Sequence, residues 1–107
     1  MPILQNEKKA LNFLKAELKK RYKLVDFKVY GSKAKGLDTP ESDLDVMVVL
    51  QNSSPSIESE IDDLIFEINL INDCLITAIY FDQKELEEGP FSESPIYKKI
   101  ALEGISL

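Results

Sequence analysis

Two aspartates, Asp43 and Asp45, stand two positions apart directly before an apolar run in this sequence. In an extended segment, residues two apart project to the same side, so both carboxylates would face one space. Carboxylate oxygens are the ligands that magnesium prefers, and the repulsion between two neighbouring carboxylates is relieved by a cation or a proton. The pair is therefore a candidate metal site and a candidate catalytic site.

A glycine and a serine upstream of the acids supply the features of an anion site. Gly31 allows the backbone to approach a ligand closely. Ser32 follows with a hydroxyl and a backbone N–H where a helix could start, a setting that suits phosphate. Lys33 and Lys35 add positive charge nearby. We interpret this segment as a phosphate anchor.

Each of these parts also has a purely structural interpretation. A Gly-Ser pair after a strand is a common turn, and two acids at the start of a strand are often solvated loop residues. Their order is more specific than either part: a strand, Gly-Ser, ten intervening residues, Asp-x-Asp and an apolar strand. This order predicts that a phosphate anchor and metal ligands lie at the ends of adjacent strands.

The composition excludes several other chemistries. The chain has no histidine and one cysteine, so it can form neither an internal disulfide nor the usual Cys/His zinc site. Nucleophilic mechanisms that pair serine or cysteine with histidine are excluded for the same reason. The apolar neighbours of Cys74 indicate packing rather than reactivity. Carboxylates remain as the obvious acid, base or metal-binding groups.

The charge of the chain is negative overall and unevenly distributed. The net charge is −6, which argues against a nucleic-acid partner because such affinity depends on Lys and Arg neutralising phosphates. Residues 1–36 carry ten Lys/Arg and three Asp/Glu, whereas residues 37–107 carry three and sixteen. The basic end could attract phosphate, but its lysines could equally form the solvated face of a helix.

Helices and strands that could position these groups follow from the apolar pattern. Leucines at helical spacing (Leu4, Leu11, Leu14, Leu18) predict an amphipathic helix over 3–21. β-branched and aromatic residues predict a strand over 24–30 that stops at Gly31, and a loop then runs to Ser42. The unbroken apolar run 46–50 is typical of a central strand covered on both faces.

The second half of the chain predicts a further helix, a strand and a short last helix. Ser54 can cap a helix that begins at Pro55; its apolar stripe is Ile57, Ile61, Leu64, Ile65, Ile68 and Ile71. We expect a third strand over 75–81 and a helix from Ser94-Pro95 to Gly104, after which Ile105 and Leu107 fold back. We expect Glu85, Glu87 and Glu88 on a solvated loop or a partner-facing surface. The tyrosines (Tyr22, Tyr30, Tyr80, Tyr97) are expected to be half-buried.

Together these elements predict one α+β domain over residues 1–107, with a small mixed β-sheet flanked by helices. A chain of this length supports one small core. No apolar run approaches the roughly 20 residues that span a bilayer, and the N-terminus lacks the apolar region of a signal peptide. We therefore expect a cytoplasmic protein with no membrane association.

The Gly-Ser and Asp-x-Asp segments resemble the minimal nucleotidyltransferases of the DNA polymerase β superfamily, whose motif has the same order and spacing. The tail, with Ser94–Ile100 and Glu103–Ile105, resembles one branch of that family, so the resemblance spans nearly the whole chain. It implies a polymerase β palm-like fold that uses magnesium, with two ions, and ATP as substrate. The implied catalytic and metal-binding residues are Asp43 and Asp45, and the implied nucleotide-binding residues are Gly31, Ser32 and Lys33.

Relatives of this kind are often encoded beside a helical HEPN-type toxin and act as its antitoxin, in some cases by transferring AMP to it. The resemblance thus implies transfer of AMP from ATP to a helical HEPN-type protein partner. The alternative is a catalytically weak or inactive antitoxin that masks its partner by binding. Polymerisation on nucleic acid is disfavoured by the acidic balance of the chain.

The sequence departs from the family pattern at one position. The full active site of the family has a third carboxylate on the third strand, and the corresponding position falls at about Thr77. Asp73 and Asp82 flank that strand, and either could substitute only if the strand is shorter or shifted. Two alternatives follow. Either the active site lacks its third carboxylate, or Asp73 or Asp82 supplies that carboxylate from a position other than Thr77.

Overall fold

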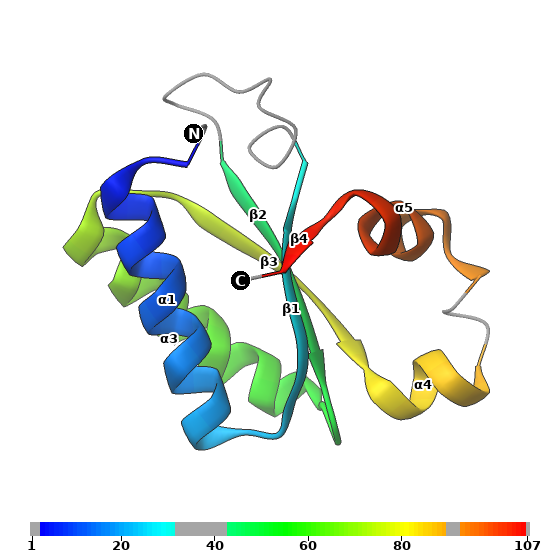
Figure 1. The fold of residues 1–107 in the computed structure, drawn as a ribbon. Coiled ribbons are helices and arrows are strands. Elements are labelled where there is room, and N and C mark those ends of the chain that lie inside the picture. The colour runs from blue at the N-terminus through cyan, green and yellow to red at the C-terminus, as the bar shows by residue number, and fades with distance from the viewer. Residues whose placement is uncertain (1–2, 32–42, 90–92, 107) are drawn as a thin grey trace.

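The computed structural model describes residues 3–31, 43–89 and 93–106, which form a mixed sheet between two layers of helices (Figure 1). In chain order the elements are α1 (Gln5–Arg21), β1 (Leu24–Tyr30), β2 (Leu44–Leu50), α3 (Pro55–Asn72), β3 (Ile76–Asp82), α4 (Gln83–Glu88), α5 (Pro95–Glu103) and β4 (Ile105–Ser106). This arrangement confirms the predicted α+β fold class.

The four strands lie in the order β3-β2-β1-β4. β1 pairs antiparallel with both β2 and β4, whereas β2 and β3 are parallel and are connected through α3. Tyr30 is the register partner of Asp45, and Asp45 is the register partner of Thr77. One row across the sheet therefore carries an aromatic, an acidic and a hydroxyl side chain.

The sheet has an apolar cluster on each face. β2 begins two residues earlier than the predicted strand, at Leu44, and its apolar side chains alternate between the two clusters. Leu44, Val46, Val48 and Leu50 pack on the face that α1 and α3 cover (Figure 1). Met47 and Val49 belong to the opposite cluster, with Phe81 and with Ile100 of α5. By the same alternation Asp45 projects to the α5 side of the sheet.

The ends of α3 explain why this helix forms where it does. Ser54 Oγ accepts a hydrogen bond of 3.2 Å from the backbone N–H of Ile57, and Pro55 occupies the first turn, as predicted. Asp73 ends the helix with a φ of 50°, in the left-handed region. Its buried stripe is Ile61, Ile65 and Ile68.

Two predicted members of the apolar stripes are exposed instead. Ile71 is 81% exposed, because at about 100° per residue it lies roughly 80° around α3 from Ile61, at the edge of the buried stripe. Leu4 is 44% exposed, because it precedes α1 as the N-cap residue, where its N–H donates to Glu7 Oε1 at 2.9 Å. The stripes are therefore narrower than the sequence predicts.

The acidic segment after β3 is a helix rather than the predicted loop. Glu85, Glu87 and Glu88 lie exposed on α4, which begins because Asp82 Oδ2 accepts from the backbone N–H groups of Lys84 and Glu85 at 3.1 and 3.3 Å.

The C-terminal segment folds back onto the sheet. Gly104 is the C-cap of α5, and Ile105 then pairs with Val29 as part of β4, as predicted, while Leu107 lies outside the described residues. Over the described ranges, no helix combines the length and apolar character needed to cross a membrane.

Candidate functional site

Asp45 lies half-buried in β2, at the end of the strand near Gly31. Thr77 Oγ1 on the neighbouring strand donates a hydrogen bond of 2.8 Å to Asp45 Oδ1. Asp43 is exposed and directly precedes β2, two positions from Asp45. The extended geometry assumed for the aspartate pair is thus observed at Asp45, where a neighbouring hydroxyl holds one carboxylate oxygen in place.

Gly31 makes room for the Asp45 carboxylate. Its φ is 80°, a backbone conformation that residues with a Cβ rarely adopt. A Cβ added to Gly31 would lie 2.7 Å from Asp45 Oδ2, so the carboxylate would have to move. The sequence interpretation assigned Gly31 to phosphate approach; the structure adds that its missing side chain leaves room for the second oxygen of Asp45.

Thr77, where the resemblance implies a third carboxylate, lies on β3 as the register partner of Asp45. Asp82 lies five residues further along β3, or roughly 16 Å away. Its Oδ1 accepts from the backbone N–H of Ser53 at 2.8 Å, and its other oxygen caps α4. Asp73 precedes β3 as the residue that ends α3. Neither acid therefore replaces a carboxylate at Thr77.

The carboxylates of Asp43 and Asp45 suit magnesium when a bound nucleotide supplies phosphate oxygens as further metal ligands. Within residues 3–31, 43–89 and 93–106, no group of three or more His, Cys, Asp or Glu side chains is arranged to hold a metal ion. Magnesium is usually held by one or two carboxylates together with substrate phosphates and waters. Asp43, and Asp45 lying against Gly31, fit that mode of binding. Ser32 and Lys33 lie outside the described residues, so their nucleotide-binding role stays a prediction.

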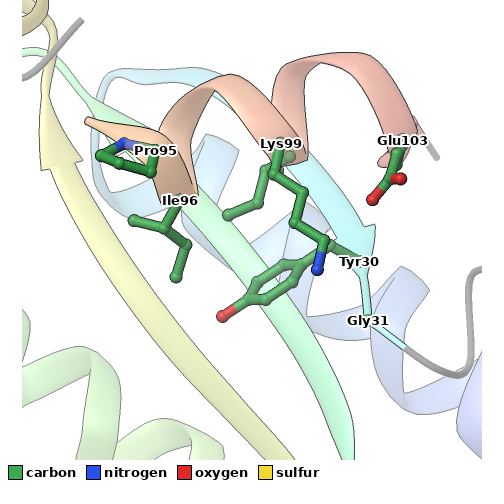
Figure 2. Close-up of a pocket in the computed structure, with 7 residues that line it drawn as sticks. Tyr30, Gly31, Pro95, Ile96, Lys99 and Glu103 are labelled. Atoms are coloured by element: carbon green, nitrogen blue, oxygen red, sulfur yellow. The ribbon is translucent and has the colours of Figure 1, made fainter. Parts of the chain in front are cut away.

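A cavity of about 370 Å³ opens beside this carboxylate, between α5 and the end of β1 (Figure 2). Its walls are formed by Tyr30, Gly31, Pro95, Ile96, Lys99, Ile100 and Glu103. The sequence interpretation missed the α5 residues as site residues. Their spacing shows only an ordinary amphipathic helix, and it is the return of the chain through β4 to β1 that brings α5 to Gly31.

Tyr30 lines the cavity and is the register partner of Asp45. Burial, and secondly the nearby negative charge of Asp45, raise the pKa of the Tyr30 phenol above its ordinary value of 10.0. The phenol is therefore neutral at physiological pH and adds no negative charge next to the carboxylate. All four tyrosines are half-buried, as predicted.

Comparison with known proteins identifies the fold. The family model described as "Nucleotidyltransferase domain" matches residues 11–104. A toxin-antitoxin crystal structure with AMP-PNP is 17% identical, with a TM-score of 0.64 over 96% of this chain and 72% of that chain. The structure of a candidate minimal nucleotidyltransferase is 17% identical, with a TM-score of 0.63 over 94% and 91% of the two chains. No curated protein matches the sequence.

Proposed function

The chain belongs to the nucleotidyltransferase domain family, and on this premise we propose that it transfers AMP from ATP, in the presence of magnesium, to a hydroxyl group of a protein partner. The observation that carries the proposal is the position of Asp45. One oxygen of its carboxylate accepts a hydrogen bond from Thr77, and the other lies close to Gly31. This arrangement supports a site for a metal-bound triphosphate.

In the proposed reaction, Asp43 and Asp45 hold the metal, and Gly31, Ser32 and Lys33 hold the phosphates. Bound magnesium neutralises triphosphate charge and favours in-line displacement. The partner's hydroxyl oxygen bonds to the α-phosphorus, the bond from that phosphorus to the leaving pyrophosphate breaks, and the hydroxyl proton passes to solvent. The chain needs no nucleophile of its own for this step.

We further propose that the partner is a helical HEPN-type toxin and that this chain is its antitoxin. A comparison supports a protein as the substrate. One protein of the same fold is described as part of a toxin-antitoxin. The negative net charge favours a protein over a nucleic acid as the acceptor.

A second candidate function is an antitoxin that masks its partner by binding and transfers AMP slowly or not at all. The observation that favours it is Thr77, which stands where the resemblance implies a third carboxylate. In two-metal transfer, that carboxylate helps to hold the metal that activates the attacking oxygen. Nucleotide binding would survive its absence better than catalysis.

The experiment that tests both functions is co-purification of the chain with the product of its neighbouring gene, followed by intact mass measurement after incubation with ATP and magnesium. Addition of one AMP unit to the partner, absent with Asp43→Asn and Asp45→Asn together, supports the enzyme. A stable complex whose partner stays unmodified supports the masking antitoxin. Native purification that yields a free chain with no companion contradicts both antitoxin roles.

A further inference from the structure

The cavity between α5 and β1 has two unlike ends. Figure 2 shows Pro95 and Ile96 on α5 above the ring of Tyr30, whose hydroxyl points toward the Ile96 end. The side chains of Lys99 and Glu103 lie toward Gly31 at the other end. One end of the cavity is therefore apolar and partly aromatic, and the other end carries charged groups.

The charged end of the cavity adjoins the aspartate site. Gly31 lines the cavity and also lies close to the carboxylate, because a Cβ added to Gly31 would be 2.7 Å from Asp45 Oδ2. A single ligand could therefore contact the Asp45 carboxylate and extend past Gly31 into the cavity. Such a ligand would have a charged, metal-binding end and a flat, less polar end.

Building on the proposed function, we propose that this cavity holds the nucleoside part of the triphosphate, with the base against Tyr30 and Ile96 and with Lys99 beside the phosphates. A volume of about 370 Å³ lies at the lower end of the range of small-molecule sites, roughly 300–1,000 Å³. An aromatic face and aliphatic side chains suit the flat surface of a base, and such contacts accept any base.

Lys99 is available for this contact, whereas its neighbour is engaged elsewhere. Lys98 Nζ lies 2.7 Å from Glu93 Oε2 and does not line the cavity. Over the described residues, Lys99 has no hydrogen bond or ion pair with another side chain, and Figure 2 shows it reaching down toward Tyr30. An ammonium group at this position would offset phosphate charge next to Asp45.

The same helix offers matched controls for a binding experiment. Lys98→Gln removes the same charge as Lys99→Gln, one position away and outside the cavity. Leu102 is 87% exposed and does not line the cavity, so Leu102→Gln is the control for Ile96→Gln. Lys99 and Ile96 are both exposed, so their substitution leaves the core intact.

The test is calorimetric titration of the full chain with Mg-ATP and with Mg-tripolyphosphate, which has the phosphates but no nucleoside. We expect Mg-ATP to bind at least about tenfold more tightly than Mg-tripolyphosphate, because burying one well-packed apolar group contributes an affinity difference of about that size. Ile96→Gln should weaken Mg-ATP several-fold and leave Mg-tripolyphosphate unchanged, Lys99→Gln should weaken both, and the two controls should alter neither.

Equal affinity of the natural chain for the two ligands, with no effect of Ile96→Gln, would overturn the inference while the proposed function stands. Unchanged binding of both ligands to Lys99→Gln would overturn the assignment of Lys99. Failure of the proposed function has a different signature, which is Mg-ATP binding that survives the combined Asp43→Asn and Asp45→Asn substitutions.

Discussion

Thr77 Oγ1 donates a hydrogen bond of 2.8 Å to Asp45 Oδ1 across the parallel strands β3 and β2. The two residues are register partners, so a side chain at position 77 is directed to the same side of the sheet as the Asp45 carboxylate. A hydroxyl here orients the carboxylate without adding charge. An acid here would place a carboxylate beside Asp45, which together with Asp43 would give the site three carboxylates.

We predict that Thr77→Asp raises AMP transfer without much change in Mg-ATP affinity. The third carboxylate supports the metal that activates the incoming hydroxyl, whereas the triphosphate depends on Asp43 and Asp45. Metal ions contribute several kcal/mol of transition-state stabilisation to such reactions, and about 1.4 kcal/mol corresponds to a tenfold change in rate. The rate of AMP transfer therefore has room to rise at least about a hundredfold. The measurement is radiolabelled AMP appearing on the co-purified partner.

Thr77→Asn is the control for Thr77→Asp, because it has nearly the same shape and no charge. It should not raise transfer. Fast transfer by the natural chain that is unaffected by Thr77→Asp, but lost when Asp73 or Asp82 is replaced, would contradict the assignment of Thr77 as the third position.

We predict that Asp43→Asn combined with Asp45→Asn abolishes Mg-ATP binding, because these are the two carboxylates that we propose hold the cation. Removal of magnesium with a chelator should have the same effect on the natural chain. Calorimetry measures both. Metal-independent ATP binding of unchanged affinity in the double variant would exclude this site.

The charge-matched control for the aspartate pair is Asp63→Asn with Glu67→Gln, two exposed residues of α3. It removes two negative charges and should leave Mg-ATP affinity unchanged. In the absence of metal, the Asp43/Asp45 variant should unfold at a temperature no lower than the natural chain, since replacement relieves repulsion between like charges.

We predict that Gly31→Ala lowers the free energy of unfolding by about 1–2 kcal/mol, because alanine is strained at a φ of 80°. It should also weaken Mg-ATP binding, because its Cβ displaces Asp45 Oδ2. Denaturant unfolding and calorimetry measure the two effects.

Gly31→Asn separates strain from displacement, because asparagine adopts positive φ more readily but still has a Cβ. It should lose less stability than Gly31→Ala and lose Mg-ATP affinity to a similar extent. Full affinity in both variants would show that the space beside Asp45 is not used by the ligand.

We predict that Tyr80 contributes to stability up to about pH 10 and less above it. Its hydroxyl donates to Asp62 Oδ1 at 2.5 Å; burial, and secondly this hydrogen bond, raise the Tyr80 pKa far above 10.0. Above pH 10 the unfolded chain loses the phenol proton while the folded chain keeps it, so the stability that this raised pKa provides is progressively lost.

The measurement is the free energy of unfolding of the natural chain and of Tyr80→Phe at pH 8 and near pH 11. The natural chain should be more stable at pH 8, by about 1 kcal/mol for the hydrogen bond, and the difference should shrink or reverse at the higher pH. A difference that is constant across this range would contradict the raised pKa.

Local patterns in the sequence predicted much of the fold and named part of the candidate site. Asp43 and Asp45 are recognisable because their spacing and the apolar strand after them are contiguous in the chain. The N-cap at Ser54 is equally local, since a cap involves residues only three positions apart. The position of Thr77 could be estimated from its place within the predicted third strand.

Only the tertiary structure decided which distant groups meet at that site. The strand register brings the Thr77 hydroxyl to Asp45, and the pairing of β4 with β1 brings Lys99 and Ile96 to Gly31. The tertiary structure also places Asp82 at the start of α4, where it caps the helix far from Asp43 and Asp45. Register and docking depend on which apolar surfaces pack together across the chain, and no local pattern contains that information.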